Sequence, residues 1–336
     1  MAKRKLNELP KLHEFHGYMG YIGYTGYSDC AARRSSCNSC NFCNHATHAP
    51  HVTLISTAMF YHHLRNELWK LFGKKRTYIG FGAFLLAQNA MLLTFHYTHW
   101  QTQMETMLAG NGYLAQEYVS ALTVAVLMLI PQILLLMPLY AALVGGDLVA
   151  KEVEDGTLRM ILSRPISRFR LLFVKWMAGG IFSAALVLML GGTALGFARM
   201  WFPWKGMFVF VPGAVFNVLS AEQGFKLYLL SHVFMTLNAS VVLGIAFMFS
   251  CFNMKPAAAT ILALSLLFAN LVMEGIPFFE RYHEYLLTYH FRSWHNVYSQ
   301  PIPWAQVGQS MCVLLAVNLT TFLIGMAAFQ ARDIKS

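Results

Sequence analysis

Six apolar runs, each long enough to cross a lipid bilayer, limit the possible folds of this chain more than any other feature. They lie at roughly 77–97, 119–144, 170–197, 227–252, 257–275 and 308–330. A helix rises 1.5 Å per residue, so about 20 residues cross a hydrocarbon core about 30 Å thick. Charged residues make up only 12% of the chain, whereas soluble domains carry about 25%. The sequence therefore predicts an all-α polytopic membrane protein with six transmembrane helices.

The distribution of basic residues predicts the orientation of these helices. Of the 25 Lys and Arg residues, 20 lie before the first run, in the second-to-third joint, at Lys255 or after the last run. Cytoplasmic loops carry an excess of Lys and Arg. We therefore expect a multi-pass protein of the cytoplasmic (inner) membrane with both termini in the cytoplasm. Because the basic clusters flank spanning segments, we expect no nucleic-acid partner.

Residues 58–76 are expected to form an amphipathic interfacial helix before the transmembrane domain, residues 77–336. Its apolar positions recur at steps of three and four: Phe60, Leu64, Leu68 and Leu71. Glu67 and Lys70 fall elsewhere on the helical wheel, which suits a helix lying in the headgroup layer. The joints 98–118, 198–226 and 276–307 are rich in aromatic residues, which predicts short interfacial helices there.

Residues 145–170 form the only well-charged segment in the apolar part of the chain. Carboxylates come first, Gly156 then interrupts the helical pattern, and four arginines follow. Pro165 predicts a turn, since proline cannot donate to a helix. A compact polar segment between two spanning helices favours docking to a soluble partner, and arginine suits such contacts.

This segment resembles the signature of the permease subunits of ATP-binding-cassette type-2 exporters. The residues that carry the resemblance are Glu152, Glu154, Gly156, Thr157, Leu158, Leu162, Ser163, Pro165, Ile166, Ser167, Arg168 and Lys175, with Phe329, Arg332, Asp333 and Ile334 near the C-terminus. The resemblance covers residues 59–336 and includes the six spanning helices and the interfacial helix.

The resemblance implies a permease that exports a substrate while a separate ATPase subunit binds ATP and Mg and hydrolyses the ATP. The chain has no G-x-x-x-x-G-K-[ST] motif, so we expect no enzyme activity and no cofactor of its own. Residues 145–170 would be the coupling segment. Its contacts with the ATPase would be made by Glu152, Glu154, Gly156, Thr157, Leu158, Arg164, Pro165 and Arg168. A second permease, identical or different, is the other expected protein partner, and lipid surrounds both.

Polar residues within the spanning runs either join helices or face a substrate path. The candidates for the substrate path are Gln132, Asn238 and Glu274. Glu274 lies at the external end of the fifth run, where it can reach water. Helix–helix hydrogen bonds are the other interpretation of the same residues.

Residues 1–57 form a Gly/Tyr- and Cys/His-rich tail, which we expect to be disordered. Its possible metal ligands are Cys30, Cys37, Cys40, Cys43, His45 and His48, which suit zinc or an iron–sulfur cluster. Three interpretations stay open: sequence upstream of a true start at Met59, a regulatory tail, or a metal-binding tail. A metal-loaded tail would favour the alternative function, a permease-like component of a copper efflux or metalloenzyme-maturation system.

Overall fold

The computed structural model describes residues 49–163, 166–211 and 215–332. The chain divides into two compact units, Met1–Ile55 and Ser56–Ser336. Side chains are described from residue 59 onward, except at residues 115 and 116 within those ranges. The predicted tail lies almost wholly outside the described residues.

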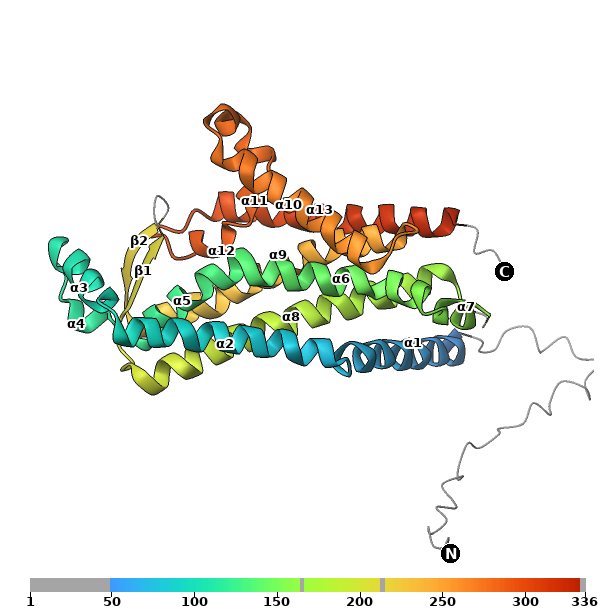
Figure 1. Ribbon diagram of the computed structural model, residues 1–336, viewed down its shortest axis with the longest axis horizontal. Coiled ribbons are helices and arrows are strands. Elements are labelled where there is room, and N and C mark those ends of the chain that lie inside the picture. The colour runs from blue at the N-terminus through green and yellow to red at the C-terminus, as the bar shows by residue number, and fades with distance from the viewer. Residues whose placement is uncertain (1–48, 164–165, 212–214, 333–336) are drawn as a thin grey trace, which may run out of the picture. The chain divides into compact units, whose positions relative to one another are not determined.

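In the described residues, six helices are long and apolar enough to span a membrane (Figure 1). They are α2 (Lys75–Tyr97), the continuous rod α5–η1–α6 (Ala121–Glu154), α8 (Arg168–Trp201), α9 (Ala221–Cys251), α10 (Pro256–Gly275) and α13 (Trp304–Ala331). The predicted six-helix all-α membrane fold is thus confirmed. The second span continues ten residues beyond the predicted 144, because an apolar run does not reveal a helix that continues through glycines and charged residues.

The rod between residues 121 and 154 contains one irregular turn. α5 (Ala121–Pro131) passes into the π-helix η1 (Gln132–Leu136), and α6 (Met137–Glu154) completes the rod. The backbone N–H of Met137 donates to the carbonyl of Gln132, five residues earlier. A single π turn of this kind often marks a functional segment of a helix.

The first helix, α1 (Ala49–Phe72), begins nine residues before the predicted start at 58. Leu71 is buried on its inner face, as its periodicity predicts. Glu67 is buried as well, at 7% exposure, so its predicted place on the outer polar face was wrong. The reason is that other helices supply basic partners for its carboxylate, which a helical wheel of one segment cannot show. Whether α1 lies in the headgroup layer stays a prediction.

The joints contain short elements. Two of them hold short helices, as expected: α3 (Trp100–Gly110) and α4 (Ala115–Tyr118), then the 3₁₀ helix η2 (Pro277–Tyr285), α11 (Leu287–His290) and α12 (Ser293–Asn296). The joint 198–226 instead forms an antiparallel hairpin, β1 (Met207–Val211) and β2 (Val215–Leu219), with Met207 opposite Leu219. The helix expected there was wrong, because alternating Phe and Val favour a strand. The Thr123 hydroxyl also accepts a hydrogen bond from the N–H of Phe208.

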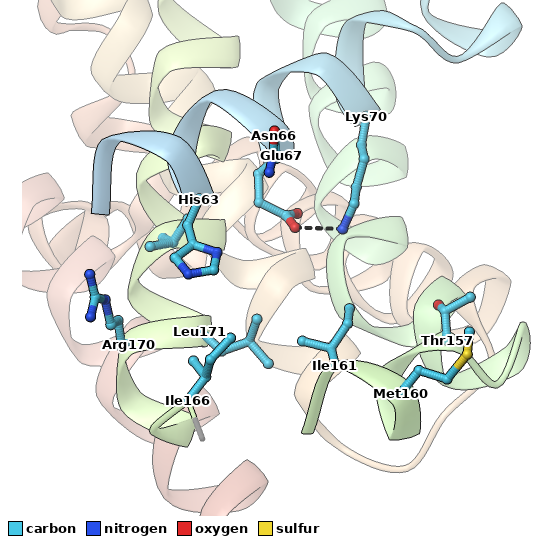
Figure 2. Close-up of a pocket in the computed structure, with 11 residues that line it drawn as sticks. His63, Asn66, Glu67, Lys70, Thr157, Met160, Ile161, Ile166, Arg170 and Leu171 are labelled. Carbon is cyan, nitrogen blue, oxygen red and sulfur yellow. Dashed lines mark hydrogen bonds and ion pairs between the residues drawn. The ribbon is translucent and has the colours of Figure 1, made fainter. Parts of the chain in front are cut away.

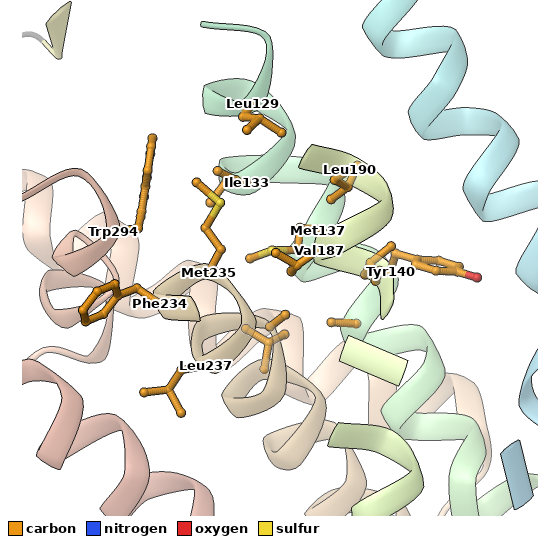
Figure 3. Packing of buried hydrophobic residues seen from close by; sticks show 14 of the residues in the cluster. Leu129, Ile133, Met137, Tyr140, Val187, Leu190, Phe234, Met235, Leu237 and Trp294 are labelled. Carbon is orange, nitrogen blue, oxygen red and sulfur yellow. The ribbon is translucent and has the colours of Figure 1, made fainter. Parts of the chain in front are cut away.

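The core is built around α9. Of the most apolar stretch of α9, 72% is buried, against 22% in α2 and in α10. Figure 3 shows side chains from the α5–η1–α6 rod, α8, α9 and α12 packing together, among them Met137, Val187 and Met235. A Cβ added at Gly145 would lie 2.3 Å from the carbonyl oxygen of Leu243. The α6 and α9 backbones therefore touch, as small residues allow in membrane bundles.

The bundle has two ends, which are named here by the short elements they carry (Figure 1). The α7 end carries α1, the short helix α7 (Thr157–Leu162) and the last turn of α13. The hairpin end carries β1, β2 and α3.

Candidate functional site

At the α7 end, the chain turns sharply between two spanning helices. Gly156 adopts a left-handed conformation with φ of +70°, which a residue without a Cβ reaches at little cost. The hydroxyl of Thr157 donates to the carbonyl of Glu152 and closes the turn at 3.3 Å. Leu158 is buried at 4% exposure, whereas Arg159 and Met160 are exposed. α7 is thus anchored by its inner face and presents its outer face to the surroundings.

At the same end lies a cluster of four charged side chains, called here the junction cluster: Glu67, Lys70, Glu152 and Lys175. The ammonium of Lys175, which is 1% exposed, lies 2.9 Å from a Glu67 oxygen and 2.7 Å from a Glu152 oxygen. Lys70 lies 2.7 Å and 3.1 Å from the same two carboxylates. Two acids and two bases balance each other. The cluster therefore joins α1, α6 and α8, which carry these residues.

Opposite charges within the junction cluster favour the ionised forms of Glu67 and Lys70. Burial by itself would raise the pKa of Glu67, but the charge of Lys175 and hydrogen bonds from both lysines outweigh burial and lower it. Burial by itself would lower the pKa of Lys70, but its bonds and charge attraction to Glu67 and Glu152 raise it. At both groups the attractions outweigh the loss of hydration, so the charged side chains of Glu67 and Lys70 are favoured at neutral pH.

A second ion pair joins neighbouring helices at this end. Arg76 of α2 lies 3.1 Å from the Asp147 carboxylate of α6. The nearby Lys74 has a lowered pKa, mainly because of burial, although Asp147 partly offsets that effect. Arg76 and Asp147 thus fix the start of α2 to α6, beside the junction cluster.

Between α1, α7 and α8 lies a pocket of about 410 Å³. His63, Asn66 and Glu67 line it from α1, and Thr157, Met160 and Ile161 from α7 (Figure 2). The α8 side contributes Arg170, Leu171 and Val174, with Ile166 just before that helix. Figure 2 shows Met160 and Thr157 on one side of the pocket and His63 on the other. A depression with an exposed methionine at its rim suits the insertion of a partner's side chains.

The residues predicted to dock on an ATPase fall into different surroundings. Glu154 is exposed and pairs with Lys151 at 2.8 Å. Glu152 belongs to the junction cluster and Leu158 to the core. Arg168 donates to the carbonyls of Gln330 and Arg332, at the end of α13. Arg164 and Pro165 lie outside the described residues.

The sequence reasoning did not identify the roles of Glu67, Lys70 and Lys175 in the junction cluster. Glu67 and Lys70 are three positions apart on one helix, a spacing at which opposite charges meet. That spacing was the only sequence signal, since Lys175 lies 108 positions from Glu67.

A second cavity, called here the groove, has a volume of about 1180 Å³. Its walls come from the α5–η1–α6 rod around Ile133, from α10 between Ile261 and Gly275, and from α11 and α12. Most of the lining residues are apolar. Among the predicted substrate-path residues, Asn238 and Glu274 both line the groove.

Gln132 does not line the groove. It is 1% exposed, and its side-chain oxygen accepts a hydrogen bond from the amide of Gln88 at 3.3 Å. The Gln88 amide also donates to the carbonyl of Leu190. The Gln88 amide therefore joins α2 to η1 and to α8. The buried amide of Gln132 thus takes part in a helix–helix hydrogen bond, as the second interpretation of these polar residues expects.

Polar groups gather at one end of the groove. Glu274 forms an ion pair with Arg292, and the amide of Asn238 donates to the carbonyl of Phe291 at 3.0 Å. His295 is buried, and burial together with the positive charge of Arg292 lowers its pKa to about 4. At neutral pH its ring is therefore uncharged.

The predicted metal ligands Cys30, Cys37, Cys40, Cys43, His45 and His48 lie outside the described residues. Between residues 59 and 332, in the part that the structure describes, no group of three or more His, Cys, Asp or Glu side chains is placed to hold a metal ion.

Comparison with known proteins identifies the family. The family model described as ABC-2 family transporter protein matches residues 64–334. This range includes the junction cluster, α7 and the groove. No curated protein matches the chain. The family match covers most of the chain and agrees with its six apolar helices. The chain therefore belongs to the ABC-2 transporter family and is a membrane-spanning permease component of an ABC transporter.

Proposed function

We propose that the chain is the permease of an ATP-driven exporter and that α7 docks on a separate ATPase subunit. The observation that carries the proposal is the two-sided construction of α7. Its inner face is fixed by Leu158, which is buried in the core, while Arg159 and Met160 are exposed. A helix anchored in this way passes a movement of its partner to the helices beneath it.

The burial of the individual side chains refines the predicted docking set. Glu154, together with the exposed Arg159 and Met160, forms the contact surface. Glu152, Leu158 and Arg168 act indirectly, because their side chains are engaged within the chain and hold α7 in place. In this proposal the α7 end lies in the cytoplasm, in line with the excess of Lys and Arg that predicts cytoplasmic termini. A second permease, identical or different, completes the transporter.

Co-purification tests this docking. The tagged full-length chain is purified from its native membranes, and Mg-dependent ATP hydrolysis by the recovered material is measured. The double substitution Arg159→Glu and Met160→Asp places two negative charges on the proposed contact surface of α7. It is expected to remove at least nine tenths of the recovered ATPase activity, because an unpaired charge buried at an interface weakens binding by about tenfold or more.

The chain offers a matched control at the hairpin end. Arg199 and Met200 are the same two residue types, also adjacent and exposed, so Arg199→Glu with Met200→Asp keeps the change in charge but moves it to the opposite end. The control variant is expected to retain the ATPase. Equal losses in both variants, or no ATPase with the unmodified chain, would contradict the proposal.

A further inference from the structure

The groove lies where an amphiphile in the bilayer can reach it. Its lining includes Leu134, Leu135, Ile261 and Phe268, whose exposed fractions lie between 62% and 69% although they belong to membrane-spanning helices. The α10 wall runs from Ile261 to Glu274, about 20 Å at 1.5 Å per residue. One leaflet of a bilayer core is about 15 Å thick. The groove is therefore long enough for one apolar chain of ordinary lipid length.

The polar end of the groove holds buried groups whose hydrogen bonding is incomplete. In the part of the chain that the structure describes, the side-chain oxygen of Asn238 and the hydroxyl of Thr288 have no hydrogen-bond partner. Both residues line the groove. Buried polar atoms are almost always paired, and an unpaired one is costly. An acceptor and a hydroxyl left unpaired beside one cavity indicate that a ligand supplies their partners.

The charges at this end leave no net charge for a ligand to neutralise. Among the residues that the structure describes, Glu274 and Arg292 are the only Asp, Glu, Lys or Arg that line the groove, and they pair with each other. His295 is neutral at physiological pH. A cationic head would have to separate Glu274 from its arginine, and an anionic head would have to separate Arg292 from its carboxylate. An uncharged head needs neither change.

We propose that the groove binds an amphiphile with one apolar chain and an uncharged head that carries hydroxyl groups, and that this is the substrate class of the permease. The assignment of this amphiphile as the transported substrate rests on the proposed export function, whereas its binding in the groove does not. The head lies beside Asn238 and Thr288 and makes the hydrogen bonds that these side chains lack. The apolar chain lies along α10, beside Leu264 and Phe268.

A binding assay on the full-length chain, without any ATPase, tests this inference. The chain is placed in lipid nanodiscs and titrated with radiolabelled 1-monooleoylglycerol, with oleate, oleylamine and glycerol as competitors. We expect saturable binding of monooleoylglycerol. Oleate, oleylamine and glycerol are expected to compete at least about tenfold more weakly, because two of them carry a charge and the third lacks the apolar chain.

Two variants, each with its own control, locate the bound molecule. Thr288→Val removes a hydroxyl that makes no hydrogen bond to the described residues. This variant is expected to weaken binding about five- to tenfold, as loss of one hydrogen bond does. Thr236→Val is its control, because the Thr236 hydroxyl donates to the carbonyl of His232 within α9 and Thr236 is not among the described residues that line the groove. Leu264→Trp fills the apolar part and is expected to abolish binding, whereas Leu319→Trp on the exposed side of α13 is not.

Several outcomes would overturn the inference. They are absence of monooleoylglycerol binding, equally tight binding of oleate or oleylamine, equal effects of Thr288→Val and Thr236→Val, and cross-links showing that a second copy fills the groove. The ATPase co-purification described above is a separate measurement. Failure of ligand binding with retained ATPase would refute the substrate class alone, and the reverse result would refute only the export function.

Discussion

Replacing Lys175 by methionine tests the junction cluster most directly. Lys175 is the only one of the four side chains that is almost completely buried, at 1% exposure, and it contacts both carboxylates. Methionine keeps the length and apolar stem of lysine but removes the charge. Glu67 and Glu152 would then face each other with only the half-exposed Lys70 between them.

The expected loss of stability follows from burial and from the partners that remain. Removing one member of a buried ion pair costs about 3–5 kcal/mol, because the other charge is left unpaired. Lys70 still lies 2.7 Å and 3.1 Å from the two carboxylates. The loss for Lys175→Met should therefore fall at the lower end, about 3 kcal/mol.

Unfolding in mixed micelles of increasing SDS content, followed by tryptophan fluorescence, measures this loss. Adding Glu67→Gln and Glu152→Gln to Lys175→Met should restore stability to within about 1 kcal/mol of the original, because whole buried ion clusters can be replaced at little cost. Lys226→Met is the control, since Lys226 pairs with Glu222 on the exposed surface of α9, and should leave stability unchanged. A stability of Lys175→Met equal to that of the control would refute the reasoning.

Three further predictions follow from the fold and the charges. Gly145→Ala should destabilise the chain by about 1–3 kcal/mol through overpacking against the α9 backbone, whereas Gly82→Ala, with open space around it, should stabilise it by about 0.5–1 kcal/mol; SDS unfolding distinguishes the two. Glu67 has a lowered pKa in the folded chain, so its stabilising effect should be complete above about pH 5 and be lost as the pH falls through that lowered pKa. The difference in stability from Glu67→Gln should therefore shrink below about pH 4, and a constant difference would contradict the cluster geometry. In intact cells, Asn111→Cys should react with a membrane-impermeant maleimide while Ser163→Cys should not, and the opposite result would reverse the proposed orientation.

The spanning helices were predictable because an apolar run of the required length has few alternatives. The helix boundaries were less predictable where a helix continues beyond its apolar run, as α6 does between residues 145 and 154. The hairpin at Met207–Leu219 was missed because aromatic residues were read as a mark of the membrane boundary, although their alternation with valine also fits a strand.

The sequence predicted which types of residue would be functional, but not the partners of the individual side chains. The sequence placed charged groups around residues 152–168, but Glu152 pairs with side chains 82 positions earlier and 23 positions later. Only the tertiary arrangement separates it from Glu154, two positions away and exposed. The same limit applied to Gln132, since no property of one helix shows that an amide on another, Gln88, lies opposite it.

The π turn at Gln132–Leu136 changes how the second span should be engineered. Each residue of an α-helix turns the chain by about 100°, so the one extra residue in this turn sets the faces of α5 and α6 out of phase by that angle. A substitution pattern designed on a continuous helical wheel would follow the correct side of α5 and then point to the wrong side of α6. Deleting one residue inside the π turn would restore ordinary α-helix geometry there. A deletion elsewhere in the span would instead rotate the faces of all residues beyond it.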